Sequence, residues 1–156
     1  MSYLDATNDL YKAAALTPDV GLCCTTNPIW QLPGLDIPVI MQEMNYGCGS
    51  TVNPSDLSND PKILYVGVGG GMELLQFAYF NRNKGGVVGV DVLDEMLEAS
   101  RKNFKVAEET NDWFKSDFVD LRKGDALDLP IEDETIDVAA QNCVFNIFKL
   151  DDLSKA

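Results

Sequence analysis

The pattern of hydrophobic residues divides the chain at about residue 61. From there on, short runs of β-branched residues alternate with longer segments whose apolar residues recur at helical spacing. Strands are predicted over 63–66, 87–91, 118–123 and 136–143. A helix is predicted over 72–81, and Asp94 is expected to cap a longer one that buries Met96. Alternating strands and helices predict an α/β fold with a doubly wound parallel sheet.

The N-terminal part has a different pattern. A helix is predicted over 5–16, followed by residues 19–61, which lack sustained periodicity and hold five of the seven prolines. One helical turn is expected near 38–44. In the first predicted helix, over 5–16, the apolar residues expected to share one face are Leu4, Ala6, Leu10, Tyr11, Ala14 and Ala15. An irregular stretch this long is more typical of a functional loop than of a linker. Two regions are therefore predicted, a helix with a cysteine-containing cap or substrate loop over 1–60 and a Rossmann-like domain over 61–156.

The end of the chain has an unusual pattern. Asp151 is expected to cap another helix, yet only about one turn of sequence follows it. The apolar strand over 136–143 is of the buried type, and it is expected to lie at an edge of the sheet. Since such an edge has to be covered or paired, the sequence predicts a C-terminally truncated fragment of a longer protein. The alternative is self-association through this edge.

Composition and charge exclude several classes of function. Twelve basic and 25 acidic residues give a net charge of −13, which disfavours nucleic acid and anionic membranes as partners. The chain has no histidine, so imidazole catalysis and histidine ligands are excluded. No apolar run approaches the roughly 20 residues of a membrane span, and no signal peptide is recognisable. A cytoplasmic location is expected, with the four cysteines as thiols rather than a disulfide framework.

A glycine-rich turn follows the first predicted strand. Gly67, Gly69 and Gly71 read G-x-G-x-G, and Met72 stands where a dinucleotide fingerprint has its last glycine. Such a turn lets a ligand approach backbone N–H groups and a helix N-terminus. Asp91 and Asp125 follow the next two strands and are expected at the same crevice. There Asp91 can accept hydrogen bonds from both ribose hydroxyls, and the alternative is an acidic residue that only precedes a helix. Met96 is expected either in the core or against an adenine.

These features resemble the class I methyltransferases over residues 61–150. The resemblance implies a Rossmann-like fold and S-adenosyl-L-methionine as the methyl donor. One position departs from the family, because many members have an acidic residue where this chain has Tyr65. Contact with the methionine amino group would then fall to another residue.

Three cysteine-containing segments narrow the resemblance. Leu22-Cys23-Cys24-Thr25-Thr26, Tyr46-Gly47-Cys48-Gly49-Ser50 and Gln141-Asn142-Cys143-Val144-Phe145-Asn146 resemble segments of arsenite methyltransferases, and the chain is most similar to the branch linked to arsenosugar biosynthesis. The resemblance implies that Cys48 and Cys143 bind trivalent arsenic, and that the Cys23–Cys24 pair captures arsenic or serves a redox role. The residues it implies for the methyl donor are Tyr46, Gly67, Gly69, Gly71, Asp91, Met96, Asp125, Ala126 and Asn142. The expected partners are arsenite, or a small thiol conjugate of it, and a thiol reductant.

Trivalent arsenic is a soft thiophile and selects thiolate ligands. Its lone pair can attack a methyl carbon without a general base, so catalysis is mainly positioning. Two alternatives stay open. The chain is a methyltransferase of another small molecule with structural cysteines, or a non-catalytic module that binds S-adenosylmethionine or a thiophilic metal.

Overall fold

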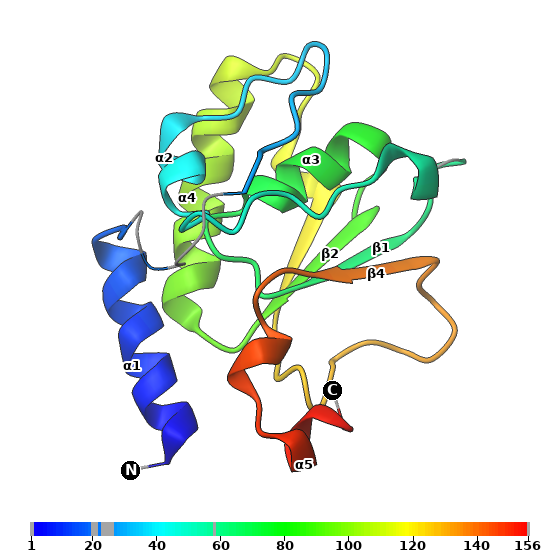
Figure 1. The fold of residues 1–156 in the computed structure, drawn as a ribbon. Helices are drawn as coiled ribbons and strands as arrows, with labels where there is room; N and C mark the ends of the chain where they lie inside the picture. Colours follow the sequence, from blue (N-terminus) through cyan, green and yellow to red (C-terminus); the bar gives the residue numbers. More distant parts are fainter. Residues whose placement is uncertain (1, 20–21, 23–26, 58, 156) are drawn as a thin grey trace.

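The computed structural model describes residues 2–19, 22, 27–57 and 59–155. Its centre is a sheet of four parallel strands in the order β3-β2-β1-β4. The strands are β1 (Ile63–Val66), β2 (Val87–Asp91), β3 (Val119–Lys123) and β4 (Val138–Gln141). Ile63 of β1 lies opposite Val87 on one side and Val138 on the other, so β1 is central and β4 is an edge strand, as predicted (Figure 1).

Helices precede and follow the strands. The α-helices are α1 (Tyr3–Leu16), α2 (Val39–Glu43), α3 (Met72–Phe80), α4 (Asp94–Thr110) and α5 (Leu150–Leu153). The 3₁₀ turns are η1 (Pro54–Asp56), η2 (Ser116–Phe118) and η3 (Phe145–Ile147). This order confirms the predicted α/β Rossmann-like fold class. In the described part of the chain, no helix is both long and apolar enough to cross a membrane.

The two faces of the sheet are covered differently. Because side chains alternate along a strand, Ile63 and Tyr65 pack with α3 and α4 in the main core, whereas Leu64 faces a second, smaller cluster. That second cluster is completed by Leu129, Ile131 and Ile136 from the irregular segment after β3. Among the described residues, the long helices α3 and α4 therefore cover one face of the sheet, and the irregular segment after β3 covers part of the other face.

Two predicted helix caps are wrong. Asp94 is the first residue of α4, and Leu93 is the N-cap, because the Asp91 carboxylate accepts the Leu93 N–H and fixes the chain before the helix. Asp151 lies inside α5, whose N-cap is Lys149. In both helices the acidic residues lie in the first turn, where a negative charge interacts favourably with the helix dipole.

Helix α1 also differs from its predicted stripe. Leu10 is 52% exposed, whereas Ala14 is buried and Tyr11 packs partly against the core. The prediction is therefore confirmed for Tyr11, Ala14 and Ala15, which pack inward, and wrong for Ala6 and Leu10, which are exposed.

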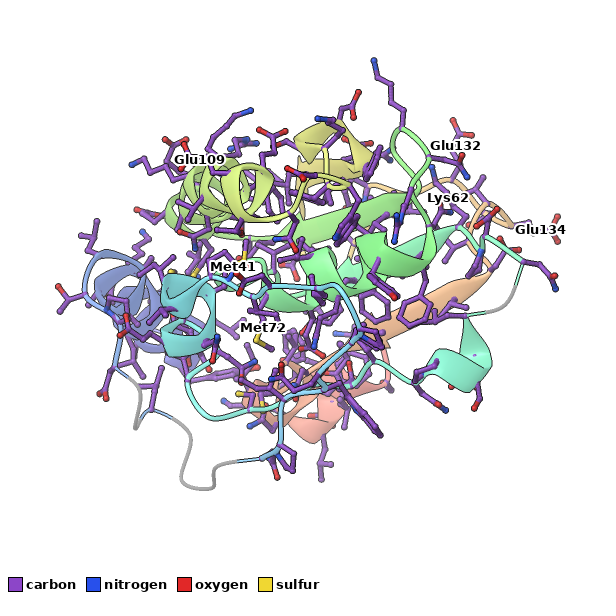
Figure 2. The ribbon with its side chains drawn as sticks, turned by 90° about the horizontal axis from the view of Figure 1, so that it is seen from above. Met41, Lys62, Met72, Glu109, Glu132 and Glu134 are labelled. Atoms are coloured by element: carbon purple, nitrogen blue, oxygen red, sulfur yellow. The ribbon has the colours of Figure 1, made fainter. Side chains whose placement is uncertain are left out.

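The acidic side chains lie mainly at the surface. Figure 2 shows Met41 and Met72 inside the molecule, and both are buried. Glu109, Glu132 and Glu134 lie at its periphery, and all three are exposed. Solvated carboxylates therefore account for a large part of the negative charge, as expected of an acidic surface.

The turn after α4 gives a stability prediction. The Ser116 N–H donates to Glu108 Oε1 at 2.7 Å, and this hydrogen bond lowers the pKa of Glu108 from its ordinary value of 4.5. A lowered folded-state pKa means that the stabilisation is present above pH 4.5 and is lost as the pH falls through the folded value. Replacing Glu108 by alanine is expected to reduce the free energy of unfolding by about 1 kcal/mol at pH 7. Urea denaturation at pH 7 and in acid measures this. Glu109→Ala, at the exposed neighbouring position, is the control, and an equal loss there would contradict the assignment.

Candidate functional site

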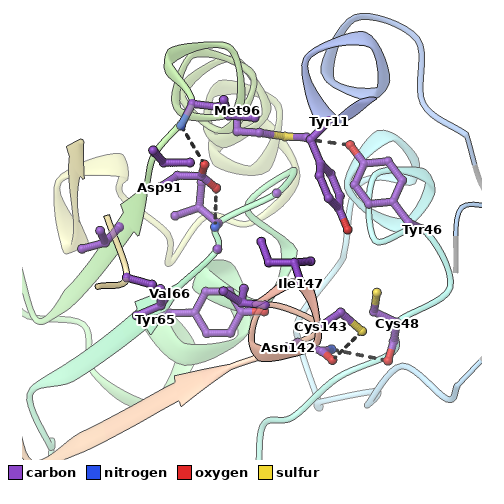
Figure 3. A pocket seen from close by; sticks show the side chains of 18 of the residues that line it. Tyr11, Tyr46, Cys48, Tyr65, Val66, Asp91, Met96, Asn142, Cys143 and Ile147 are labelled. Atoms are coloured by element: carbon purple, nitrogen blue, oxygen red, sulfur yellow. Dashed lines mark hydrogen bonds between the residues drawn. The ribbon is translucent and has the colours of Figure 1, made fainter. Parts of the chain in front are cut away.

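A cavity opens at the carboxyl ends of the strands. It is bordered by residues at the ends of β1 and β2 and after β3 and β4, and α1 and the segment 44–48 form the rest of its wall (Figure 3). The carboxyl edge of a parallel sheet is where open α/β folds bind their ligands. The cavity therefore lies at the predicted crevice.

The glycine-rich turn forms one side of the cavity. Gly67, Gly69 and Gly71 have positive φ angles of 83°, 52° and 84°, which side-chain-bearing residues rarely adopt. A Cβ at Gly67 would lie 2.3 Å from Val144 Cγ2, whereas one at Gly69 would have only the Met44 carbonyl oxygen within 4 Å, at 3.6 Å. Gly67 is thus required by packing, whereas at Gly69 a Cβ would make only an ordinary contact and the positive φ angle is what disfavours a side chain.

Asp91 ends β2 at the cavity wall. Its Oδ2 accepts the Val68 N–H at 2.9 Å and its Oδ1 accepts the Leu93 N–H at 3.0 Å. Burial raises the pKa of Asp91, and the backbone N–H groups oppose that shift only in part. The carboxylate is held rigidly, with a pair of oxygens suited to two neighbouring hydroxyl donors.

Tyr46 reaches across the cavity from the segment after α2. Its hydroxyl lies 3.9 Å from Met96 Sδ, and its ring meets the Tyr11 ring edge-on at a centroid distance of 6.3 Å. Burial, and after it the charges of Tyr11, Asp91 and Cys48, raise the pKa of the Tyr46 phenol, so it remains a donor. Its φ of 57° is left-handed, and backbone strain of this kind is found at functional sites.

Two thiols lie together at the other end of the cavity. Cys48 and Cys143 are not joined in a disulfide, and Figure 3 shows them side by side with Asn142. The Asn142 amide donates to the carbonyl oxygens of Cys48 and Gly49 at 3.4 and 3.3 Å, and the Cys143 thiol lies 3.4 Å from Asn142 Oδ1. Cys143 has a φ of 57°, like Tyr46. Over the residues that the structure covers, no group of three or more Cys, Asp or Glu side chains is arranged to hold a metal ion.

Tyr65 occupies the position where many class I methyltransferases have an acidic residue. Its hydroxyl donates to Glu73 Oε2, and both residues border the cavity. Burial, and after it the Glu73 carboxylate, raise the pKa of the Tyr65 phenol well above its ordinary value. A carboxylate is therefore present near this position, supplied by α3 rather than by β1.

Most of the residues predicted for the site border this one cavity. They are Tyr46, Cys48, Gly67, Gly69, Asp91, Met96, Ala126, Asn142 and Cys143. Two predicted cofactor residues do not: Gly71 is the N-cap of α3, and the Asp125 carboxylate accepts the Leu127 N–H in a local turn. Cys23 and Cys24 lie outside the described residues. The binding roles themselves stay predictions.

The sequence reasoning missed the contribution of α1 and of Glu73. Thr7, Asn8 and Tyr11 face the cavity from three neighbouring positions of the helix. Thr7 and Tyr11 are four residues apart and therefore share one face of the helix. This pair of a polar and an aromatic residue was the signal from which a cavity-facing side of α1 could have been predicted. Nothing in the local sequence distinguishes Glu73 from other acidic residues of a helix first turn.

Comparison with known proteins gives a family and a relative. A family model described as "Methyltransferase domain" matches residues 64–156. An arsenite methyltransferase of Halobacterium salinarum (strain ATCC 700922 / JCM 11081 / NRC-1) is 29% identical over 105 residues, which are 67% of this chain and 25% of that protein. The chain thus spans about a quarter of the length of this curated relative.

Proposed function

Because this chain belongs to the methyltransferase domain family, we propose that it transfers a methyl group from S-adenosyl-L-methionine to trivalent arsenic held by Cys48 and Cys143. The methyl donor is the cofactor of the family. The arsenic substrate is proposed from the juxtaposition of the two thiols at the cavity that also holds Asp91, and the arsenite methyltransferase match supports it. That juxtaposition carries the proposal.

The residues present fit S-adenosyl-L-methionine. The two oxygens of Asp91 suit the ribose hydroxyls, and Met96 and Ala126 supply apolar surface for an adenine beside them. The backbone of Gly67 and Gly69 and the N-terminal end of α3 border the same cavity, and they would hold the rest of the molecule. Bound there, the cofactor supplies a methyl group on a positively charged sulfonium.

The thiols suit a soft substrate. Thiolates are the ligands that soft ions select, and two of them on separate segments bind one arsenic atom as a chelate. Tyr46 lies between the thiol end and the Asp91 end of the cavity, and its raised pKa keeps it a hydrogen-bond donor there. The protein's role in this proposal is to hold both reactants in line rather than to move protons.

The transfer is balanced without a general base. The arsenic lone pair forms the new As–C bond, and the electrons of the breaking C–S bond stay on the departing thioether. Arsenic is oxidised from the +3 to the +5 state, so a further round requires a thiol reductant. Restoration of the +3 state by such a reductant is part of the proposal.

Calorimetric titration of the reduced chain tests this function. Arsenite and S-adenosyl-L-methionine are each expected to bind at one site per chain. Arsenate is expected to give no heat, because its pentavalent arsenic is a hard centre without a lone pair and is not selected by thiolates. Incubation of both ligands with dithiothreitol is expected to yield methylated arsenic and S-adenosylhomocysteine in equal amounts. Cofactor binding without arsenite binding would favour another small-molecule substrate, and binding of both without product would favour a non-catalytic module.

A further inference from the structure

Glu73 is a buried carboxylate that joins three separate segments. It lies in the first turn of α3 and is only 3% exposed. Its Oε1 accepts the N–H and the hydroxyl of Thr51, at 2.5 and 2.7 Å. Its Oε2 accepts the Tyr65 hydroxyl and the Asn142 amide, the latter at 3.2 Å. Four donors satisfy the carboxylate fully, since its two oxygens offer about four acceptor positions.

Two of these three segments carry the thiols. Thr51 follows Cys48 by three residues, and Asn142 directly precedes Cys143. Asn142 also donates to the Cys48 carbonyl oxygen, so the two thiol-bearing segments are bonded both to each other and to the same carboxylate. The bond to Glu73 requires the Asn142 NH₂ group to face α3, which leaves Asn142 Oδ1 on the side of the Cys143 thiol.

We propose that Glu73 is a positioning residue that sets the relative placement of the Cys48 and Cys143 thiols. The purpose of this positioning, binding of arsenic by both thiols, rests on the proposed function. The hydrogen bonds from which the positioning is inferred do not involve arsenic. Tyr65 strengthens the arrangement, because its phenol stays protonated and donates to Glu73 from the rigid strand β1. The carboxylate is thereby held against the sheet while it holds the two thiol segments.

The isosteric substitution Glu73→Gln is a specific test of this role. A glutamine presents an NH₂ group in place of one acceptor oxygen. If that group faces Asn142, two NH₂ groups oppose each other, and Asn142 has to turn and give up its bonds to the 48–49 carbonyls. The fold keeps a side chain of the same size, whereas the tie between the thiol segments is lost.

The first readout is the bridging of the two thiols by dibromobimane, in which each thiolate displaces one bromide. It is measured in a chain carrying Cys23→Ser and Cys24→Ser, with the bridged peptide identified by mass. Glu73→Gln is expected to slow bridging about tenfold, as for other partners that orient ligands. Thr51→Val, at an exposed position, removes only one of the four bonds and is expected to slow it about threefold.

Asn111→Ala is the matched control. Asn111 is also 3% exposed and joins α4 to the backbone of Asp36 through its side chain, but it does not border the cavity. It is expected to reduce stability without slowing bridging. Bridging at the original rate in both Glu73→Gln and Thr51→Val, or an equal slowing in Asn111→Ala, would overturn the positioning role.

The second readout is arsenite affinity in a double-mutant cycle. Glu73→Gln is expected to weaken arsenite binding about tenfold when both thiols are present, and less than about twofold in the Cys143→Ser background, where one thiol remains. Equal losses in both backgrounds would overturn the inference. Glu73-dependent bridging in a chain that does not bind arsenite would support the positioning role and contradict the proposed function.

Discussion

Replacing Cys143 by serine is expected to weaken arsenite binding by about 100-fold or more, with the affinity for S-adenosyl-L-methionine changed less than about threefold. Two linked binding groups raise the affinity by a factor of about 10² to 10⁴ over that of one group alone. The substitution removes one of the two. Serine keeps the size of the side chain and a hydrogen-bond donor toward Asn142 Oδ1, which accepts from the thiol at 3.4 Å. The loss then reports the soft ligand rather than the local fold.

Cys48→Ser is the matched partner of this experiment. Because the two thiols come from segments 95 residues apart and border one cavity, equal losses are expected from either substitution. Calorimetry at one pH gives both affinities for each variant. Unchanged arsenite binding in Cys143→Ser, together with its loss in a Cys23→Ser and Cys24→Ser chain, would move the arsenic site to the N-terminal pair.

The strands near the glycine turn could be predicted to the residue. The bounds of β1 and β2 match because β-branched runs there are interrupted by residues that end a strand, such as Gly67. Strand β4 is shorter than its apolar run, since Asn142 and Cys143 leave the sheet and Cys143 turns left-handed. Hydrophobicity could not locate this end, because the deviation comes from contacts with the distant segment around Cys48.

The site could be predicted where residue type and chain position are sufficient. Asp91 follows from its place at the end of β2, and the geometry holds it at the cavity wall. Asp125 follows β3 in the same way, yet its carboxylate is engaged in a local turn. Which of two such carboxylates faces a cavity depends on the turn each one forms, and the sequence alone does not fix that. The boundary between the regions 1–60 and 61–156 and the self-association through β4 stay predictions.

Replacing Asp91 by alanine is expected to weaken S-adenosyl-L-methionine binding about 100-fold or more, while arsenite still binds to the thiols. A hydrogen bond to a charged acceptor contributes about 1.5–3 kcal/mol, so loss of two toward the ribose hydroxyls costs about 3 kcal/mol at the lower limit. Asp94→Ala is the matched control, because it removes the same charge three residues away at an exposed side chain paired with Lys123. Calorimetry on both variants measures the two affinities for S-adenosyl-L-methionine. An equal loss of affinity in Asp94→Ala would show that the effect comes from the change in net charge and not from the two hydrogen bonds.

The pH dependence of cofactor binding identifies the same carboxylate. Burial raises the pKa of Asp91 above the ordinary aspartate value of 3.8. As the pH falls, Asp91 is therefore expected to take up a proton earlier than an ordinary aspartate, and the site then loses two charged hydrogen-bond acceptors. The stability contribution of a group with a raised folded-state pKa is fully present below the unfolded value and is lost as the pH rises through the folded one. Ionised Asp91 therefore opposes folding at neutral pH and favours binding there. The affinity of the unsubstituted chain should fall on acidification while that of Asp91→Ala stays flat, and parallel titration curves would assign the dependence to another group.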